Sequence, residues 1–370
     1  MRVGIINYSQ TDSPGGINKF VKELATSMSR QGAEISVIEP GVSPGESFED
    51  SPYVVRKIRG PMFRPPLNSS KKFVREVISW INEESPDLVH IHGHMHLLSH
   101  QLIRAIKGRT EVPVVFSPHY DVATSSKISS FLLPIFNKII GRKTANLCDH
   151  LFFSSEFESE AYINSMRGSK LAFSVIPLGV DFEISESVSR WDGVLELAYC
   201  GHLIRRKRVD RIIKLTKEII RQSPEISLRV TVVGDGPELG SLMNLATDLK
   251  IDENISWRGF LERGEMLKTI KDADFFVLLS DSEAFGITVA ESLASGTPVV
   301  ISDNTALSEF SPEPGTIMAK DPDDFQQIAR EILSLQGKEI KIGPFSDRIR
   351  EWDKTGIEYM DKYIDKIEYD

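Results

Sequence analysis

The chain has 370 residues, a formal net charge of −9 at pH 7, and 41% hydrophobic and 26% charged residues. That length exceeds one ordinary hydrophobic core and predicts two domains. The charge is uneven: residues 1–180 carry 20 Lys and Arg against 17 Asp and Glu, whereas residues 181–370 carry 24 against 36. An acidic half argues against nucleic-acid binding, while the mildly basic half is compatible with an anionic acceptor or a membrane surface.

The sequence opens on a strand-like run at residues 2–8, without a signal-peptide pattern, and no segment has the length of a bilayer span. We therefore expect a cytoplasmic protein whose membrane contact, where there is any, is peripheral and at the inner face. Cys148 and Cys200 stand in apolar contexts, and we expect both to be reduced thiols, with a disulfide between them as the alternative that the sequence leaves open.

The first turn ends in Gly15 and Gly16, ahead of a helical pattern over 17–28. Glycines at a strand-to-helix turn let the backbone approach a ligand closely, although a plain tight turn is the simpler explanation of this pair. The pattern then predicts a strand at 34–38, an irregular stretch over 40–70 with one strand at 53–58, and a helix over 73–81.

Five histidines lie between positions 90 and 100, where a strand is predicted to end. No Cys or carboxylate set follows at metal-site spacing, so we expect no metal here. His90 and His92 alternate along the strand and should point to one face. A further strand at 112–116 is followed by His119, and an isolated histidine in such a place is usually structural.

Residues 127–143 have the pattern of an amphipathic helix with basic flanks. Its apolar side chains recur at helical spacing: Ile128, Phe131, Leu132, Ile135, Phe136, Ile139 and Ile140. Packing of this stripe into the first domain is the simpler interpretation, and docking on a membrane surface is the alternative.

The second half opens with a strand at 195–199, and four consecutive basic residues, 205–208, follow in the next turn. A strand at 228–233 then leads into Gly234 and Gly236. The third glycine comes one residue too late for the dinucleotide-binding fingerprint.

The most informative stretch places a helix between buried strands at 275–279 and 298–301. Glu283 lies in the turn before this helix, and Glu291 about one and a half turns inside it. Both carboxylates can reach a ligand over the helix N-terminus, whose N–H groups attract phosphate. A nucleotide-sugar, with hydroxyls on both sides of a diphosphate, suits this pattern, although a capping and a solvated glutamate explain the spacing alone.

This block, a Glu-x7-Glu pair with Phe-Gly after the first glutamate and Gly-Thr-Pro-Val after the second, resembles the retaining GT-B glycosyltransferases, specifically glycosyltransferase family four. Other segments match in the expected order over nearly the whole chain, most strongly over 195–310. The resemblance implies an α/β fold with two doubly wound, Rossmann-like domains facing a central cleft. Their expected bounds are 1–181, joined by a C-terminal helix at about 350–370, and 195–349.

The resemblance also implies roles for single residues. Glu291 would hold the ribose hydroxyls, Glu283 the donor sugar and Lys207 the diphosphate, while His119 would meet the sugar from the first domain. The other donor-binding candidates are Phe285, Gly286, Ile287, Thr288, His202, Arg206, Gly234, Phe260, Gly15 and Gly16. Departures from the family pattern are His202 in place of an arginine, Arg208 in place of a glycine, and Tyr120 between His119 and Asp121. Arg205 or Arg206 would then supply the missing charge.

We therefore expect an enzyme that moves a sugar from a nucleotide-diphosphate-sugar to a hydroxyl of a glycan, a lipid-linked acceptor or a small molecule, without cofactor or metal. Two other classes stay open. A non-catalytic nucleotide-sugar-binding protein of the same fold is favoured by His202, whereas a nicotinamide-dependent oxidoreductase would need the glycine fingerprint that is absent.

Overall fold

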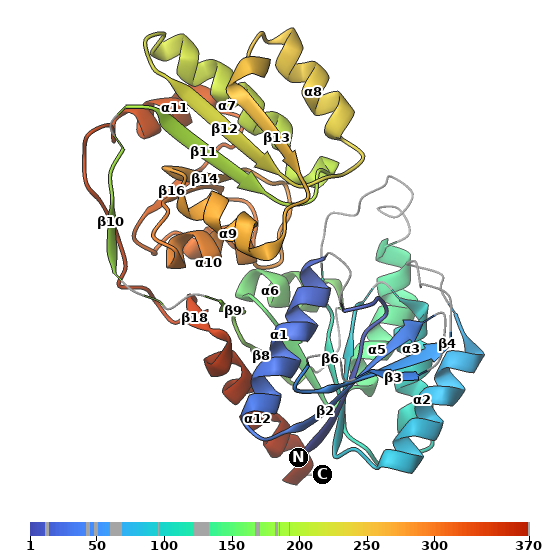
Figure 1. The fold of residues 1–370 in the computed structure, drawn as a ribbon. Coiled ribbons are helices and arrows are strands. Elements are labelled where there is room, and N and C mark those ends of the chain that lie inside the picture. Colours follow the sequence, from blue (N-terminus) through green and yellow to red (C-terminus); the bar gives the residue numbers. More distant parts are fainter. Residues whose placement is uncertain are drawn as a thin grey trace. The chain divides into compact units, whose positions relative to one another are not determined.

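A computed structural model of the chain describes residues 1–11, 15–41, 45–47, 51–59, 69–94, 96–120, 133–166, 171–181, 184, 186–191 and 193–368. The chain forms two compact units (Figure 1). Unit 1 comprises Met1–Gly179 and Trp352–Asp370, and unit 2 comprises Val180–Glu351. The chain therefore leaves unit 1 once and returns to it with its last helix.

Unit 1 is built on an eight-stranded sheet in the order β3-β4-β2-β1-β5-β6-β7-β8, parallel except between β3 and β4. The strands are β1 (Arg2–Ile6), β2 (Glu34–Gly41), β3 (Gly45–Ser47), β4 (Val54–Arg59), β5 (Leu88–His92), β6 (Val114–Ser117), β7 (His150–Phe153) and β8 (Phe173–Val175). The described helices are α1 (Gly16–Arg30), α2 (Lys71–Glu84), α3 (Leu97–Lys107), the π-helix η1 (Asn137–Gly141), α5 (Arg142–Leu147), α6 (Glu156–Ser165) and α12 (Trp352–Glu368).

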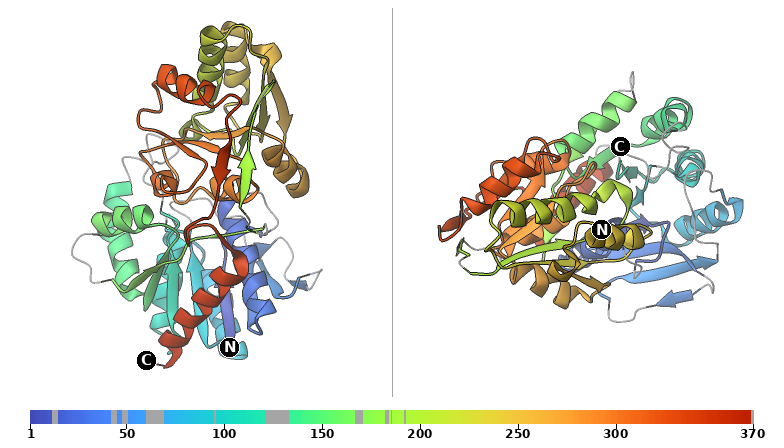
Figure 2. Two further views of the ribbon diagram at one scale, coloured as in Figure 1. Left: turned by 90° about the vertical axis from the view of Figure 1, so that its left-hand side faces the viewer. Right: turned by 90° about the horizontal axis from the view of Figure 1, so that it is seen from above.

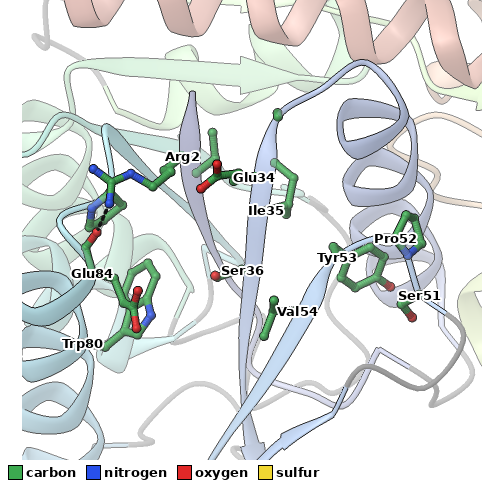
Figure 3. A pocket seen from close by; sticks show the side chains of 13 residues that line it. Arg2, Glu34, Ile35, Ser36, Ser51, Pro52, Tyr53, Val54, Trp80 and Glu84 are labelled. Carbon is green, nitrogen blue, oxygen red and sulfur yellow. Dashed lines mark hydrogen bonds between the residues drawn. The ribbon is translucent and has the colours of Figure 1, made fainter.

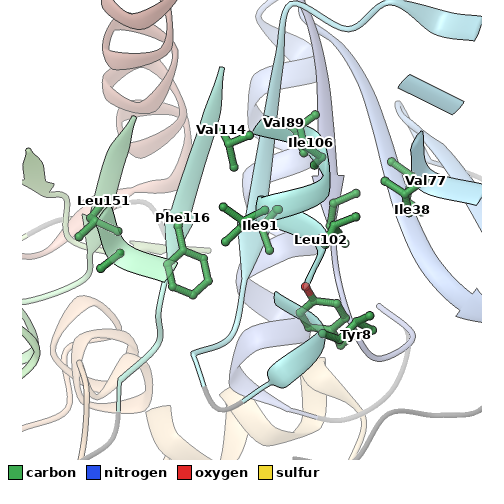
Figure 4. Packing of buried hydrophobic residues seen from close by; sticks show 14 of the residues in the cluster. Tyr8, Ile38, Val77, Val89, Ile91, Leu102, Ile106, Val114, Phe116 and Leu151 are labelled. Carbon is green, nitrogen blue, oxygen red and sulfur yellow. The ribbon is translucent and has the colours of Figure 1, made fainter. Parts of the chain in front are cut away.

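The central strands β1, β5, β6 and β7 are buried along most of their length, as a parallel sheet requires when helices cover both of its faces. Figure 4 shows one of the resulting layers, in which Ile91 and Phe116 of the sheet and Leu102 of α3 share a hydrophobic cluster. Helix α2 approaches β1 so closely that a Cβ at Gly4 would lie 2.4 Å from the Trp80 ring. Only glycine leaves room for that indole.

Helix α12 packs alongside α1 and completes unit 1 (Figure 2). Ser27 Oγ donates a 2.9 Å hydrogen bond to the Trp352 carbonyl oxygen, and a Cβ at Gly356 would lie 2.2 Å from Ser27 Oγ. Farther along the helix, Tyr359 and Tyr363 are at most 1% exposed. The last helix is therefore part of the core of unit 1.

Unit 2 contains a six-stranded, wholly parallel sheet in the order β13-β12-β11-β14-β15-β16. Its strands are β11 (Leu195–Cys200), β12 (Leu228–Val233), β13 (Ile255–Gly259), β14 (Phe275–Leu278), β15 (Val299–Ser302) and β16 (Thr316–Ala319). The longer helices are α7 (Val209–Gln222), α8 (Leu239–Asp248), α9 (Arg263–Lys271), α10 (Ile287–Ala294) and α11 (Phe325–Leu333). The strand order reverses between β11 and β14, and ligands bind such sheets beside the carboxyl ends of the strands at that point.

These elements confirm the predicted α/β class and the predicted alternation of strands and helices in both units. One addition is β3, which pairs antiparallel with β4 inside the stretch predicted to be irregular. The loops of unit 2 that follow β11 and β14 hold the basic run and the first glutamate of the Glu-x7-Glu pair.

The predicted amphipathic stripe is wrong for the part of it that the structure describes. Ile128, Phe131 and Leu132 lie outside the described residues, Phe136 is buried, and Ile135 and Ile139 are 47% and 54% exposed. The buried face instead includes Asn137 and Gly141. Asn137 Oδ1 lies 2.7 Å from His94 Nε2, and a Cβ at Gly141 would lie 2.7 Å from His94 Cε1. A polar contact and the wider π-turn thus replace the regular 3.6-residue period.

We predict that Gly141→Ala lowers the free energy of unfolding by about 1–3 kcal/mol, because the new methyl overpacks the His94 contact. Gly240→Ala is the matched control, since Gly240 is also helical and a Cβ added to it would meet no atom within 4 Å. Gly240→Ala should raise the free energy of unfolding by about 0.5–1 kcal/mol. Urea unfolding of both variants checks the pair, and equal stability would contradict the packing described here.

Candidate active site

The loop after β11 is fixed by backbone hydrogen bonds to the loop after β12. Leu203 N donates to Asp235 O at 2.9 Å, and Glu238 N donates to Leu203 O at 3.1 Å. A Cβ at Gly234 would lie 1.9 Å from the Gly201 carbonyl oxygen, and one at Gly236 2.3 Å from that of Leu203. These two glycines therefore serve the packing of one loop on the other.

Arg208 stands at the family's glycine position and adopts a left-handed backbone with φ 48°. Its guanidinium donates to Asp210 at 2.9 Å and to Asp281 at 3.2 Å, and these pairs offset the backbone strain. The Arg208 charge is thus committed to carboxylates of unit 2. In the same turn, His202 and Arg205 are exposed, whereas Arg206 is half-buried.

Lys207 and Glu283 form an ion pair between the turn after β11 and the turn after β14. Lys207 Nζ lies 2.6 and 2.7 Å from the two carboxylate oxygens of Glu283. The Glu283 side chain is 8% exposed and that of Lys207 18% exposed. An ammonium group has three N–H donors, so this geometry leaves one of them for a ligand. Sequence spacing gave no indication that the two residues pair with each other.

Helix α10 begins directly after Gly286, whose φ of 93° requires glycine. A Cβ there would also lie 2.3 Å from Leu307 Cδ2. Gly286 has no side chain with which to cap the helix, so the first N–H groups, at Ile287 and Thr288, are suited to an anion. The Phe285 ring packs edge-on against Phe310 and belongs to the core.

Glu291 lies inside α10 and is 0% exposed. It forms an ion pair with Arg263, the first residue of α9, and Arg263 also pairs with Asp181. A carboxylate buried to this degree needs such a counter-charge. Arg263 had no signal in the sequence, because 28 residues separate it from Glu291. Nearby in the chain, Phe260 follows β13 and is 64% exposed.

In unit 1, His119 follows β6 with φ 48° and stacks on His92. His92 Nδ1 and His119 Nε2 are 2.9 Å apart. Burial lowers the pKa of His92 well below its usual range, and desolvation lowers the pKa of His119 to about 4. Both imidazoles are therefore neutral at pH 7. The predicted contact of His119 with the donor sugar stays a prediction.

Buried Glu158 holds the turn that carries His119, and sequence reasoning missed it. Its carboxylate accepts from Tyr120 N at 2.8 Å and from Ser154 N at 2.9 Å. Ser155 Oγ in turn caps α6 by accepting from Glu158 N at 3.0 Å. The Ser-x-x-Glu spacing of a capping box was the available signal.

The remaining candidates in unit 1 have plainer surroundings. Gly15 and Gly16 are exposed at the start of α1, and Asp121 lies outside the described residues. His90 bonds Tyr363 Oη at 2.6 Å and Ser117 Oγ at 2.8 Å, so it anchors α12. Among the described residues, no three His, Cys, Asp or Glu side chains are grouped to hold a metal ion.

A cavity of about 390 Å³ lies elsewhere, at the amino ends of β1, β2 and β4 (Figure 3). Ligands of parallel sheets bind at the opposite, carboxyl ends. Two of its charged side chains are already engaged, since Arg2 donates to the Glu84 carbonyl oxygen at 2.7 Å and the Glu84 carboxylate pairs with Arg56 at 3.1 Å. The cavity contains none of the candidate residues.

Two doubly wound α/β units are the architecture of the GT-B fold, and the paired charges lie at the switch point of the second unit. Residues 14–184 match the model of "Glycosyltransferase Family 4", and residues 181–351 match that of "Glycosyl transferases group 1". The chain belongs to this family of glycosyltransferases and is a transferase enzyme. This assignment replaces the oxidoreductase alternative.

Curated relatives include the alpha-monoglucosyldiacylglycerol synthase of Streptococcus pneumoniae, 24% identical over 84% of this chain and 73% of the relative. The phosphatidyl-myo-inositol mannosyltransferase of Mycobacterium tuberculosis is 26% identical over 89% and 85%. The D-inositol 3-phosphate glycosyltransferase of Nocardia farcinica is 24% identical over 80% and 72%.

Solved structures show the same fold. Sucrose-phosphate synthase of Thermosynechococcus elongatus superimposes with a TM-score of 0.80 at 16% identity, covering 100% of both chains. Anabaena HepE, in complex with UDP and glucose, gives a TM-score of 0.69 at 14% identity, covering 98% of this chain and 99% of that one.

We predict that acid loosens unit 1, because its buried histidines are neutral when folded. Their folded pKa values lie below the unfolded value of about 6.5. The contribution of these histidines to the free energy of unfolding is therefore fully present above pH 6.5 and is lost as the pH falls toward 4. The opening free energy of β5, measured by hydrogen exchange, should fall by about 1–3 kcal/mol from pH 7 to 5. His92→Gln should flatten this dependence, whereas the exposed-site control His202→Gln should not. If the opening free energy of β5 depends on pH in the same way in all three proteins, the conclusion that buried His92 causes the dependence is wrong.

Proposed function

We propose that the enzyme transfers a sugar, with retention of configuration, from a nucleotide-diphosphate-sugar to a hydroxyl acceptor. The observation that carries this proposal is the Lys207–Glu283 pair at the end of β11 and β14, beside the N-terminus of α10. The positive charge of Lys207 suits the diphosphate, and the carboxylate of Glu283 suits the hydroxyls of the sugar. The UDP and glucose named in the HepE structure are ligands of this kind.

In the proposed reaction, the bond between the anomeric carbon and the diphosphate oxygen breaks. The acceptor oxygen bonds to the anomeric carbon on the same face, and its proton passes to the leaving diphosphate. Negative charge therefore grows on the diphosphate during the step. The free N–H of Lys207 and the first amides of α10 would stabilise that charge. Glu283 would accept hydrogen bonds from hydroxyls of the sugar. Glu291 would accept the ribose hydroxyls.

We expect Lys207→Ala and Glu283→Ala to reduce kcat about a hundredfold to a thousandfold, because each removes a contact that strengthens in the transition state. Glu291→Ala should chiefly weaken donor binding, by about 1.5–3 kcal/mol. Initial-rate kinetics and calorimetric titration with the nucleotide-sugar separate the two effects.

Lys217→Ala, which removes an exposed lysine of α7, is the matched control. Thermal unfolding of each variant shows whether the loss of one partner of a buried pair has unfolded unit 2. Should folded Lys207→Ala and Glu283→Ala turn over like wild type, the active site is elsewhere.

We also propose that turnover needs no divalent metal, since an ammonium group and a helix N-terminus can neutralise the diphosphate. Of the two Asp-x-Asp pairs in the sequence, Asp272-Ala273-Asp274 precedes β14. The other, Asp321-Pro322-Asp323, follows β16, but its Asp323 carboxylate already accepts from Arg211 at 2.7 Å. Dialysis against EDTA should therefore leave the rate unchanged. A complete loss that Mg²⁺ or Mn²⁺ restores would overturn the proposal.

The acceptor proposed here is a lipid at a membrane surface. The segment 133–147 has no acidic residue and exposes Ile135 and Ile139 on either side of exposed Lys138. Apolar and basic side chains on one helical face are typical of interfacial helices. The names of two relatives refer to diacylglycerol and to phosphatidyl-myo-inositol. No helix in the described ranges has both the length and the apolar character of a membrane span.

We predict that wild type sediments with vesicles containing anionic phosphatidylglycerol but less with pure phosphatidylcholine, and that Ile139→Ser and Lys138→Glu each reduce this binding. Ile357→Ser is the matched control, because Ile357 is 50% exposed on α12 of the same unit. Equal sedimentation of all four proteins would exclude a role for this segment.

A further inference from the structure

The buried Glu291 carboxylate is neutralised by a side chain from another element. Arg263, at the start of α9, donates to Glu291 Oε1 and to Asp181 Oδ2 through the same guanidinium nitrogen. Helix α9 packs beside both α10 and β11. The elements on the other side of α10, β14 and β15, contain no charged side chain. Arg263 is therefore the cation that the fold supplies to Glu291.

This ion pair differs from an ordinary structural bridge in its exposure. The Glu291 side chain is 0% exposed, whereas that of Arg263 is 36% exposed. One end of the pair is thus fixed in the core and the other reaches solvent. A carboxylate has about four lone-pair sites, so the bond from Arg263 leaves capacity for hydroxyl donors. Because the carboxylate itself is 0% exposed, a ligand hydroxyl can reach it only beside or past the guanidinium of Arg263.

We propose that Arg263 is a positioning residue for the nucleoside half of the donor, acting through Glu291. It balances the charge of the buried carboxylate and fixes its orientation, so that Glu291 meets the vicinal hydroxyls of a ribose. The inference rests on the proposed function and deepens it, because it names the residue through which the preference of Glu291 for ribose over deoxyribose is set.

Asp181 has a supporting part in this arrangement. It holds the same guanidinium nitrogen from the segment that opens unit 2, and so limits the directions from which Arg263 can approach Glu291. Asp181→Asn removes this second charge but leaves the Arg263–Glu291 pair. We expect Asp181→Asn to keep the preference for ribose.

The test compares nucleoside diphosphates with their 2′-deoxy forms. UDP, GDP and ADP are titrated calorimetrically into wild type to find the one that binds, and its 2′-deoxy analogue is then titrated. Loss of one charge-assisted hydrogen bond should weaken binding of the analogue about tenfold or more in wild type. In Arg263→Gln this ratio should fall toward one, and Arg263→Lys should restore most of it.

Arg229→Gln is the matched control, since Arg229 pairs with Glu196 at an exposed site of the same unit. It should keep the wild-type ratio. Thermal unfolding accompanies every variant, because Arg263→Gln leaves a buried carboxylate without its partner. The double variant Arg263→Gln with Glu291→Gln contains no buried charge and remains informative if the single variant does not fold.

The double variant also decides how Arg263 acts. If Arg263 acts only through Glu291, adding Arg263→Gln to Glu291→Gln changes neither the dissociation constant nor the ribose preference. A further loss of binding would mean that Arg263 contacts the ligand by itself and would overturn the inference. A wild-type ratio in folded Arg263→Gln would overturn it as well. If wild type binds none of the three diphosphates, the proposed function itself is wrong.

Discussion

A buried carboxylate must have a partner, and this requirement organises the candidate site of unit 2. Glu283 and Glu291 lie before and within α10, and neither is open to bulk solvent. Lys207 comes to the first from the turn after β11, and Arg263 comes to the second from α9. The reversal of strand order between β11 and β14 puts the turns that follow these two strands side by side. The topology of the sheet thus brings together the charged side chains that neutralise each other in the site.

Much of the fold could be predicted from the sequence because local and long-range preferences agree there. Short apolar runs such as 275–279 became buried strands, and the glycine at 286 became the left-handed residue before α10. Composition and spacing are sufficient in such places, since a parallel sheet covered on both faces demands continuous apolar strands. The two glutamates of the candidate site were singled out by their position around one helix, but only the family resemblance gave them roles.

Interactions between elements could not be predicted, because they depend on which side chains meet in space. No periodicity indicates that Lys207 bonds Glu283 or that Arg263 serves Glu291. The segment around Asn137 shows the opposite failure, in which a clear apolar period is overruled by a polar contact with His94. Likewise, Arg208 tolerates a left-handed backbone that local preference would assign to glycine, since carboxylates hold its guanidinium.

The return of α12 to unit 1 has a consequence for synthesis of the chain. The first 179 residues leave the ribosome without the helix that covers His90 and Phe20, and 172 residues of unit 2 are made before it appears. Domains generally fold as they emerge, but here the earlier unit must wait with part of its core uncovered. Unit 2 can finish first, although it is encoded later. A chaperone that binds apolar surface would meet the nascent protein on the face that α1 and α12 later share.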